Sequence, residues 1–193
     1  MSKNVKPVNP MKVITGPDTR WSFVNVWQAK SINGGAPKYS VSLIIPKSDT
    51  RTVAKIKAAI EAAYREGESK LKGNGKSVPA LSVIKTPLRD GDIEKEDDPT
   101  FEGCYFFNAS CKSKPGVRVL DGGTNYEAMD SDDFYSGCYG AVTINFFPYE
   151  NSGNKGVAAG LNNLIKTRDG ERLSGGRTAD EDLGDMSGGS VLD

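Results

Sequence analysis

The chain has 193 residues, with 25 basic and 25 acidic side chains, a formal net charge of zero and no histidine. The zero hides an uneven distribution: residues 1–89 carry 16 Lys and Arg against 5 Asp and Glu (16 − 5 = +11), whereas residues 178–193 carry 5 acids and no base. Without histidine, an imidazole general base and histidine-based zinc sites are excluded. Three cysteines without a C-x-x-C spacing indicate buried free thiols rather than a zinc site or a disulfide scaffold.

Hydropathy and length indicate where the protein is located and how many domains it has. No run of about 18 apolar residues is present, and the N-terminal residues lack the apolar core of a signal peptide. We therefore expect a cytoplasmic protein without membrane association. The length allows one domain with a real core, plus tails.

The first elements in chain order are an extended arm and two strands. Residues 1–10 include two prolines and predict the arm. Residues 20–30 are rich in aromatic and β-branched side chains, which predicts a strand. After a turn at residues 34–37, alternating apolar residues predict a second strand over 38–45, which Pro46 ends.

One long helix is expected from about Asp49 to Glu68. Ser48, Asp49 or Thr50 can cap its first turn. Apolar residues then recur three or four positions apart, at Val53, Ile56, Ile60, Ala63 and Tyr64. This stripe predicts a helix that packs against the rest of the domain.

The second half of the chain predicts more strands, after a mostly irregular stretch over residues 73–103. The expected strands are 105–114, 116–120, 137–149 and an edge strand at 157–165, with one helical turn near 130–135. Gly, Ser and acidic residues dominate from 172 onward, which predicts a disordered acidic tail over 172–193. Residues 1–171 are thus expected to form a single, mainly β domain with one long helix. An OB-fold-like antiparallel β-barrel is the best match.

Two acidic clusters raise the hypothesis of a nuclease. Asp90 and Asp92, or Asp130 and Asp132, could hold divalent metal, and a carboxylate-only metal site needs no histidine. The first cluster lacks the calcium-loop spacing, and exposed acidic runs are usually solvated loops. We therefore expect no metal, no cofactor and no enzymatic activity.

A more informative pattern combines aromatic and basic residues on strands. Trp21, Phe23 and Trp27 occupy alternate positions of the first long strand, between Arg20 and Lys30. Rings can stack on unpaired bases and cations can replace counterions on phosphate, so such a face suits single-stranded DNA of any sequence. Each ring could equally be part of the core. The candidate DNA contacts are Arg20, Trp21, Phe23, Trp27, Lys30, Lys38, Tyr39, Lys85, Phe106, Lys112, Lys114 and Arg118.

The acidic end carries a separate prediction. Its candidate partner-binding residues are Asp180, Glu181, Asp182, Asp185, Leu192 and Asp193. Such a tail can compete with nucleic acid for the basic face or present a short peptide to partner proteins. A merely solubilising terminus is the alternative.

Several motifs resemble a family of bacteriophage single-stranded DNA-binding proteins, first described as a domain of unknown function and similar in architecture to the T7-type proteins. They are Arg20-Trp21-Ser22-Phe23, the run from Gly35 to Ser40, Asn108-Ala109-Ser110, the run from Tyr135 to Tyr139, and the stretch from Asn145 to Asn163. The resemblance covers residues 8–185. It implies an OB-fold, sequence-independent binding of single-stranded DNA in phage replication or recombination, and an acidic tail that docks replication proteins.

Further expectations concern the end of the tail, the partners, the oligomeric state and one alternative function. Related tails commonly end in an aromatic residue, whereas this one ends in Val191-Leu192-Asp193. The partners expected are single-stranded DNA and phage or host replication and recombination proteins, in the cytoplasm of the infected bacterial cell. Edge strands and long arms also allow a homodimer. A phage structural or adaptor protein is a further alternative, in which the barrel mediates only protein contacts.

Overall fold

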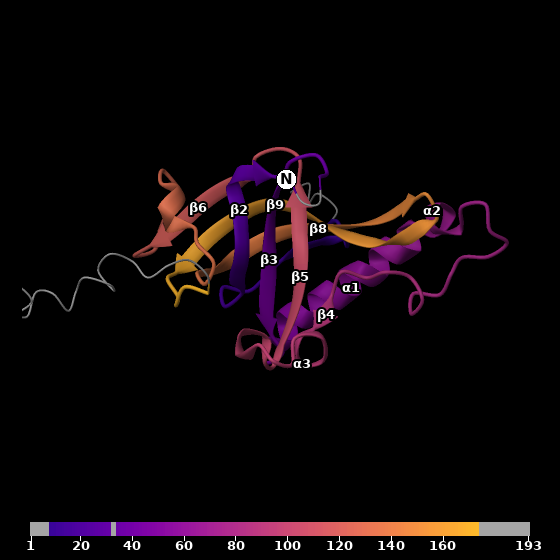
Figure 1. Cartoon of the computed structure of the whole chain (residues 1–193), viewed down its shortest axis with the longest axis horizontal. Helices are drawn as coiled ribbons and strands as arrows, with labels where there is room; N and C mark the ends of the chain where they lie inside the picture. Colours follow the sequence, from indigo (N-terminus) through magenta and orange to yellow (C-terminus); the bar gives the residue numbers. More distant parts are fainter. Residues whose placement is uncertain (1–7, 32–33, 174–193) are drawn as a thin grey trace, which may run out of the picture.

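A computed structural model describes residues 8–31 and 34–173 of the chain. Its strands are β1 (Lys12–Ile14), β2 (Arg20–Lys30), β3 (Lys38–Pro46), β4 (Arg89–Asp90), β5 (Cys104–Cys111), β6 (Gly116–Asp121), β7 (Thr124–Glu127), β8 (Tyr139–Asn151) and β9 (Asn154–Arg168). Its helices are α1 (Thr50–Glu66), α2 (Glu68–Lys72) and α3 (Gly91–Glu94), and Pro99–Phe101 and Ser131–Asp133 form 3-10 turns. The predicted strands and the long helix are all present (Figure 1).

Five strands pair in a closed ring, in the order β8, β2, β3, β5, β9 and back to β8. Neighbours in the ring are antiparallel except β5 and β9, which are parallel and meet at Ser110 and Gly160. Strand β1 extends the sheet beside β8, and the β6–β7 hairpin extends it beside β9. The expected mainly β, OB-fold-like architecture with one long helix is therefore confirmed.

Strand β9 differs from the prediction in length and place. It has 15 residues and lies between β8 on one side and β5 and β6 on the other, so it is not an edge strand. Glycines weaken the strand pattern in the sequence, but here they allow close backbone approach. A Cβ added at Gly156 would lie 2.3 Å from the carbonyl oxygen of Lys85, so this position requires glycine.

Helix α1 begins where the sequence predicts. The Asp49 side chain accepts a hydrogen bond from the Thr52 backbone N–H, which satisfies one of the free donors of the first turn. The apolar stripe packs against β8, β1 and β9, and Ile56 and Ala63 are fully buried. The core lies between this helix and the ring of strands. Within the residues that the structure describes, no helix has both the length and the apolar character needed to span a bilayer.

Candidate nucleic-acid interface

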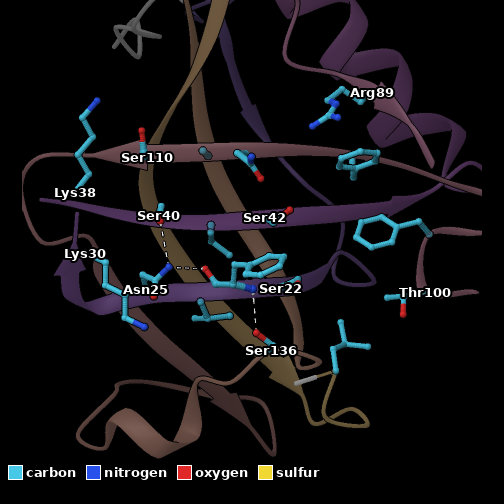
Figure 2. A pocket seen from close by; sticks show the side chains of 18 of the residues that line it. Ser22, Asn25, Lys30, Lys38, Ser40, Ser42, Arg89, Thr100, Ser110 and Ser136 are labelled. Carbon is cyan, nitrogen blue, oxygen red and sulfur yellow. Dashed lines mark hydrogen bonds between the residues drawn. The ribbon is translucent and has the colours of Figure 1, made fainter. Parts of the chain in front are cut away.

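A groove of about 990 Å³ crosses the outer face of β2, β3 and β5 (Figure 2). Its floor carries hydroxyl and amide side chains from all three strands. These are Ser22, Asn25, Ser40, Ser42, Asn108 and Ser110. One wall is the connection between β2 and β3, and the other is formed by β4, by Lys95 after α3 and by the turn Pro99–Phe101. A polar floor beneath an open groove suits an elongated ligand with polar edges.

Phe23 stands in this groove on a bulge of β2. The pairing register of β2 against β3 shifts between Ser22 and Asn25, and Phe23 has a φ of 47°. Its backbone groups are held by side chains instead of the strand ladder. The Phe23 N–H donates to Ser136 Oγ (2.9 Å), and the Asn25 amide donates to the Phe23 carbonyl oxygen (3.1 Å). The ring is 70 % exposed, so the bulge presents an aromatic surface to the groove.

The two tryptophans of the same strand lie on its other face, which corrects the prediction for Trp21. Trp21 is fully buried in the core, and its indole Nε1 donates to the Gly140 carbonyl oxygen (3.1 Å). Both Trp21 and Trp27 stack on Phe134, with centroids 6.3 Å away. Regular alternation would place all three rings of β2 on one face, but the register shifts between Ser22 and Asn25 and again between Asn25 and Lys30, so Phe23 lies on the opposite face from Trp21 and Trp27. Trp21 therefore has no surface for a base.

Positive charge lies at both ends of the groove. Lys30 and Lys38 face each other across β2 and β3 at one end, and Arg89 and Lys95 line the other. The Arg89 guanidinium pairs with Glu94 and lies 4.7 Å from the centre of the Phe106 ring. Sequence reasoning missed Arg89 and Lys95, because they flank or interrupt an acidic run. Phe106, a predicted DNA contact, lines the groove but is only 3 % exposed, beneath Arg89.

The structure places the remaining predicted contacts outside the groove. Arg20 donates to the carbonyl oxygens of Gly137 and Glu171, Lys114 lies 4.1 Å from the centre of the Trp27 ring, and Arg118 bonds Asn125. Tyr39 is half-buried beside Lys38, and Lys112 is exposed just beyond β5. Lys85 lies against β9 through a bridge to Gly156. Of the twelve predicted residues, the groove brings together Phe23, Lys30, Lys38 and Phe106.

Most of the candidate metal-binding carboxylates make local ion pairs or hydrogen bonds. Lys47 Nζ lies 2.7 Å from carboxylate oxygens of both Asp90 and Asp92, and the Lys47 ammonium together with the Gly103 N–H lowers the pKa of Asp92. Asp130 accepts a hydrogen bond from the Asp132 N–H at the start of a 3-10 turn. Over residues 8–31 and 34–173, no three Cys, Asp or Glu side chains gather closely enough to hold a metal ion. Local ion pairing and capping account for the carboxylates of Asp90, Asp92 and Asp130.

The last residues that the structure describes lead to the groove. The Tyr135 hydroxyl donates to an Asp169 carboxylate oxygen and to the Gly170 carbonyl oxygen. Burial is the main cause that raises the pKa of Tyr135. The Leu173 N–H donates to the Ser136 carbonyl oxygen (2.9 Å), and the Leu173 side chain lines the groove beside Phe101 and Phe106. The candidate tail residues between Asp180 and Asp193 lie outside the described residues.

Comparison with known proteins gives concordant matches. The family model described as the ssDNA-binding protein of Enterobacter phage Enc34 matches residues 11–190. A curated protein named putative protein p50, from Acyrthosiphon pisum secondary endosymbiont phage 1, is 34 % identical over 178 residues, which cover 88 % of this chain and 91 % of that protein.

Two solved structures share the fold. The single-stranded DNA-binding protein of bacteriophage Enc34, in complex with ssDNA, superposes with a TM-score of 0.66 at 25 % identity, covering 85 % of this chain and 90 % of that one. The gp2.5 protein of bacteriophage T7, a single-stranded DNA-binding protein, gives a TM-score of 0.57 at 18 % identity, covering 94 % and 98 %. The match of the family model over residues 11–190 shows that the chain belongs to the family of the phage Enc34 ssDNA-binding protein.

Proposed function

We propose that the protein binds single-stranded DNA, without sequence preference, in the groove across β2, β3 and β5. The observation that carries the proposal is Phe23, a 70 % exposed ring that a strained backbone presents at the centre of a polar groove. Stacking on a base needs only a π-face and therefore tolerates any sequence. Family membership and the ssDNA complex of the Enc34 protein support the same ligand.

Phosphates would meet the cations at the two ends of the groove. Lys30 and Lys38 are exposed at one end, and Arg89 and Lys95 at the other. Asp98 is the acid among the lining residues, so the described wall carries four cations and one acid (4 − 1 = +3). The serine and asparagine side chains of the floor can bond sugar and base edges without selecting one base.

The biological role proposed is protection and organisation of single strands in phage DNA replication or recombination, in the cytoplasm of the infected bacterial cell. Binding rather than catalysis is the proposed activity, since the carboxylates of Asp90, Asp92 and Asp130 make local ion pairs or hydrogen bonds. An edge strand supports pairing of two copies as a homodimer: β1 has β8 as its partner among the described strands, and Ile14 on it is 58 % exposed.

The acidic tail is proposed to compete with DNA and to dock replication or recombination proteins of the phage or host. Leu173 lines the groove, so the chain continues from the groove into a stretch whose last 16 residues carry five acids and no base. Because the tail is joined to the chain at the groove, its effective concentration there is high, which favours its competition with DNA. Removal of residues 178–193 should therefore tighten binding of single-stranded DNA and leave the fold unchanged.

A salt titration with labelled oligo(dT), for the full chain and the truncated chain, tests both statements. We expect affinity for oligo(dT) that falls steeply with salt and exceeds affinity for duplex of equal length. Equal affinity for duplex and single strand would refute the proposed ligand. Unchanged affinity on truncation would refute only the competing tail. Incubation of labelled DNA with Mg²⁺ or Mn²⁺ should leave it intact, and cleavage would favour the nuclease alternative.

A further inference from the structure

A second group of cations lies outside the groove, where α2, the segment after it and the hairpin of β8 and β9 come together (Figure 1). Lys155 Nζ donates to the carbonyl oxygen of Lys72 (3.1 Å), and the Lys85 N–H donates to the carbonyl oxygen of Lys155 (3.3 Å). Helix α2 also carries Lys70, and Lys76 follows it. These five residues are called the lysine cluster below.

The lysine cluster has little acidic compensation. Over the residues that the structure describes, no carboxylate lies within ion-pair distance of its five ammonium groups. The acids on the same elements are Glu68 and Glu150, and a Glu150 oxygen accepts from the Gly153 N–H (3.0 Å). Five cations and two acids leave a net charge of +3 at this surface. Cations held together in this way maintain a positive potential that attracts a polyanion.

A short segment joins the lysine cluster to the groove. The backbone of Lys85 forms a β-bridge with Gly156 of β9. Four residues later, Arg89 of β4 lies opposite Phe106 in the pairing with β5, and its side chain lines the groove. An extended chain rises about 3.3 Å per residue, so these two backbone positions are at most roughly 13 Å apart. Lys85 and Arg89 are both exposed, while Ile84 and Leu88 pack against the core. A strand that leaves the groove past Arg89 would next meet Lys85.

We propose that the lysine cluster is a second contact site for single-stranded DNA, which holds the phosphates of a strand that continues beyond the groove. The inference rests on the proposed function and extends its site. Lysine binds phosphate as a point charge with a flexible stem, so this extension would add affinity without base preference. It also gives a place to Lys85, a predicted phosphate contact that the groove does not include.

The test compares strand lengths. Affinity for oligo(dT) of about 6 and about 30 nucleotides, which bracket most of the range of 4–16 nucleotides per OB-fold, is measured over a salt series. The variant is Lys72→Ser/Lys85→Ser/Lys155→Ser. The matched control is Arg51→Ser/Lys55→Ser/Lys57→Ser, which removes the same charge from exposed positions on α1. Thermal unfolding of each protein confirms that it folds.

We expect the cluster variant to bind the long strand with a log–log salt slope smaller by about 2, since each phosphate contact contributes about 0.7. Its affinity for the short strand should equal that of the control variant. Equal slopes of the cluster and control variants on the long strand would overturn the inference. An equal loss of affinity for the short and the long strand would also overturn it. So would a difference between the two variants that disappears when residues 178–193 are removed, because the lysine cluster would then bind the acidic tail. If the unmodified protein binds neither strand, the proposed function itself is wrong.

Discussion

Both faces of β2 carry aromatic residues, but the rings are buried or packed on one face and exposed on the other. On the inner face, Trp21 and Trp27 stack on Phe134, and Trp21 is fully buried. On the outer face, Phe23 is 70 % exposed in the groove. The difference comes from two register shifts of β2 against β3. In the first, Phe23 adopts a positive φ and Ser136 and Asn25 bond its backbone. An aromatic residue in a strand is thus assigned to core or ligand by local backbone geometry rather than by composition.

The energetic consequences should differ as sharply as the geometry. A buried ring contributes to the free energy of unfolding through packing, whereas an exposed ring contributes to binding through stacking. A bulge with a non-glycine residue at positive φ is costly, on the order of 1–3 kcal/mol, and persists where the surroundings fix it. The following variants separate these contributions.

The largest effect is expected from Trp21→Ala. It should lower the free energy of unfolding by about 3–5 kcal/mol, because it removes a large buried ring and leaves a cavity. It also removes the hydrogen bond that the indole donates to the Gly140 carbonyl oxygen. Denaturant unfolding followed by circular dichroism measures the change. A stable Trp21→Ala protein with weakened DNA binding would reverse the roles assigned to the two faces.

The next effect is expected from Phe23→Ala. It should weaken binding of oligo(dT) by about 1–3 kcal/mol, or roughly 5- to 150-fold, through loss of a stacking surface. Phe23→Gly is the matched control: it should lose the same affinity but unfold with a free energy about 1 kcal/mol higher than Phe23→Ala, because glycine adopts positive φ without strain. Fluorescence anisotropy and denaturant unfolding give the two numbers. Full affinity in either variant would remove Phe23 from the site.

Much of the fold follows from the sequence, because the local signals agree with the tertiary structure. The cap at Asp49 and the apolar stripe of α1 are local patterns that the structure confirms. Strand β3 is present as predicted, but residues 41–45 are all buried and do not alternate between core and surface. The length of β9 does not follow, since its strand character depends on partners on both sides and on glycines that let backbones approach.

The candidate site is less readable from the sequence, for two physical reasons. Two register shifts along β2 change which side chains face outward. No local pattern marks the first, between Ser22 and Asn25, because the Ser136 hydroxyl that holds it is 113 residues away from Phe23. The groove also includes Arg89 and Lys95 from an acidic stretch, in which Asp90 and Asp92 pair with Lys47 and Glu94 pairs with Arg89. Such pairings need the three-dimensional arrangement.

A smaller effect is expected from Trp27→Phe. Trp27 is partly exposed beside Lys114 but does not line the groove, whereas Trp21 is sealed in the core. Any quenching of tryptophan emission by DNA should therefore come from Trp27. The variant should bind labelled oligo(dT) within about twofold of the unmodified protein, because base stacking of about 1–3 kcal/mol occurs at Phe23 instead. Its own emission should not change on binding. A several-fold loss of affinity would show that DNA crosses to the inner face.

The smallest effect concerns pH and separates the groove wall from the core. Lys47 holds Asp90 and Asp92 at the end of the groove that carries Arg89 and Lys95, and it lowers the pKa of Asp92 below its ordinary value. A carboxyl whose pKa is lower in the folded protein adds stability above the ordinary value of about 3.9, and this contribution is lost as pH falls through the folded pKa. Asp92→Asn should remove the loss of stability that this carboxyl causes as the pH falls.

The measurement is the melting temperature as a function of pH, for Asp92→Asn and for the control Asp97→Asn, whose carboxylate is exposed in the same acidic run. The carboxylates of Asp92 and Asp97 are both solvent-accessible, so the change in melting temperature should be modest and should be smaller in high salt. At pH 7 the Asp92→Asn protein should be the less stable of the two, and the difference should narrow below about pH 4. Loss of the ion pair should also displace Arg89 and Lys95 and weaken DNA binding while Trp21 stays buried. An equal pH dependence of the two variants would mean that the groove wall, like the core, is held by packing rather than by charge.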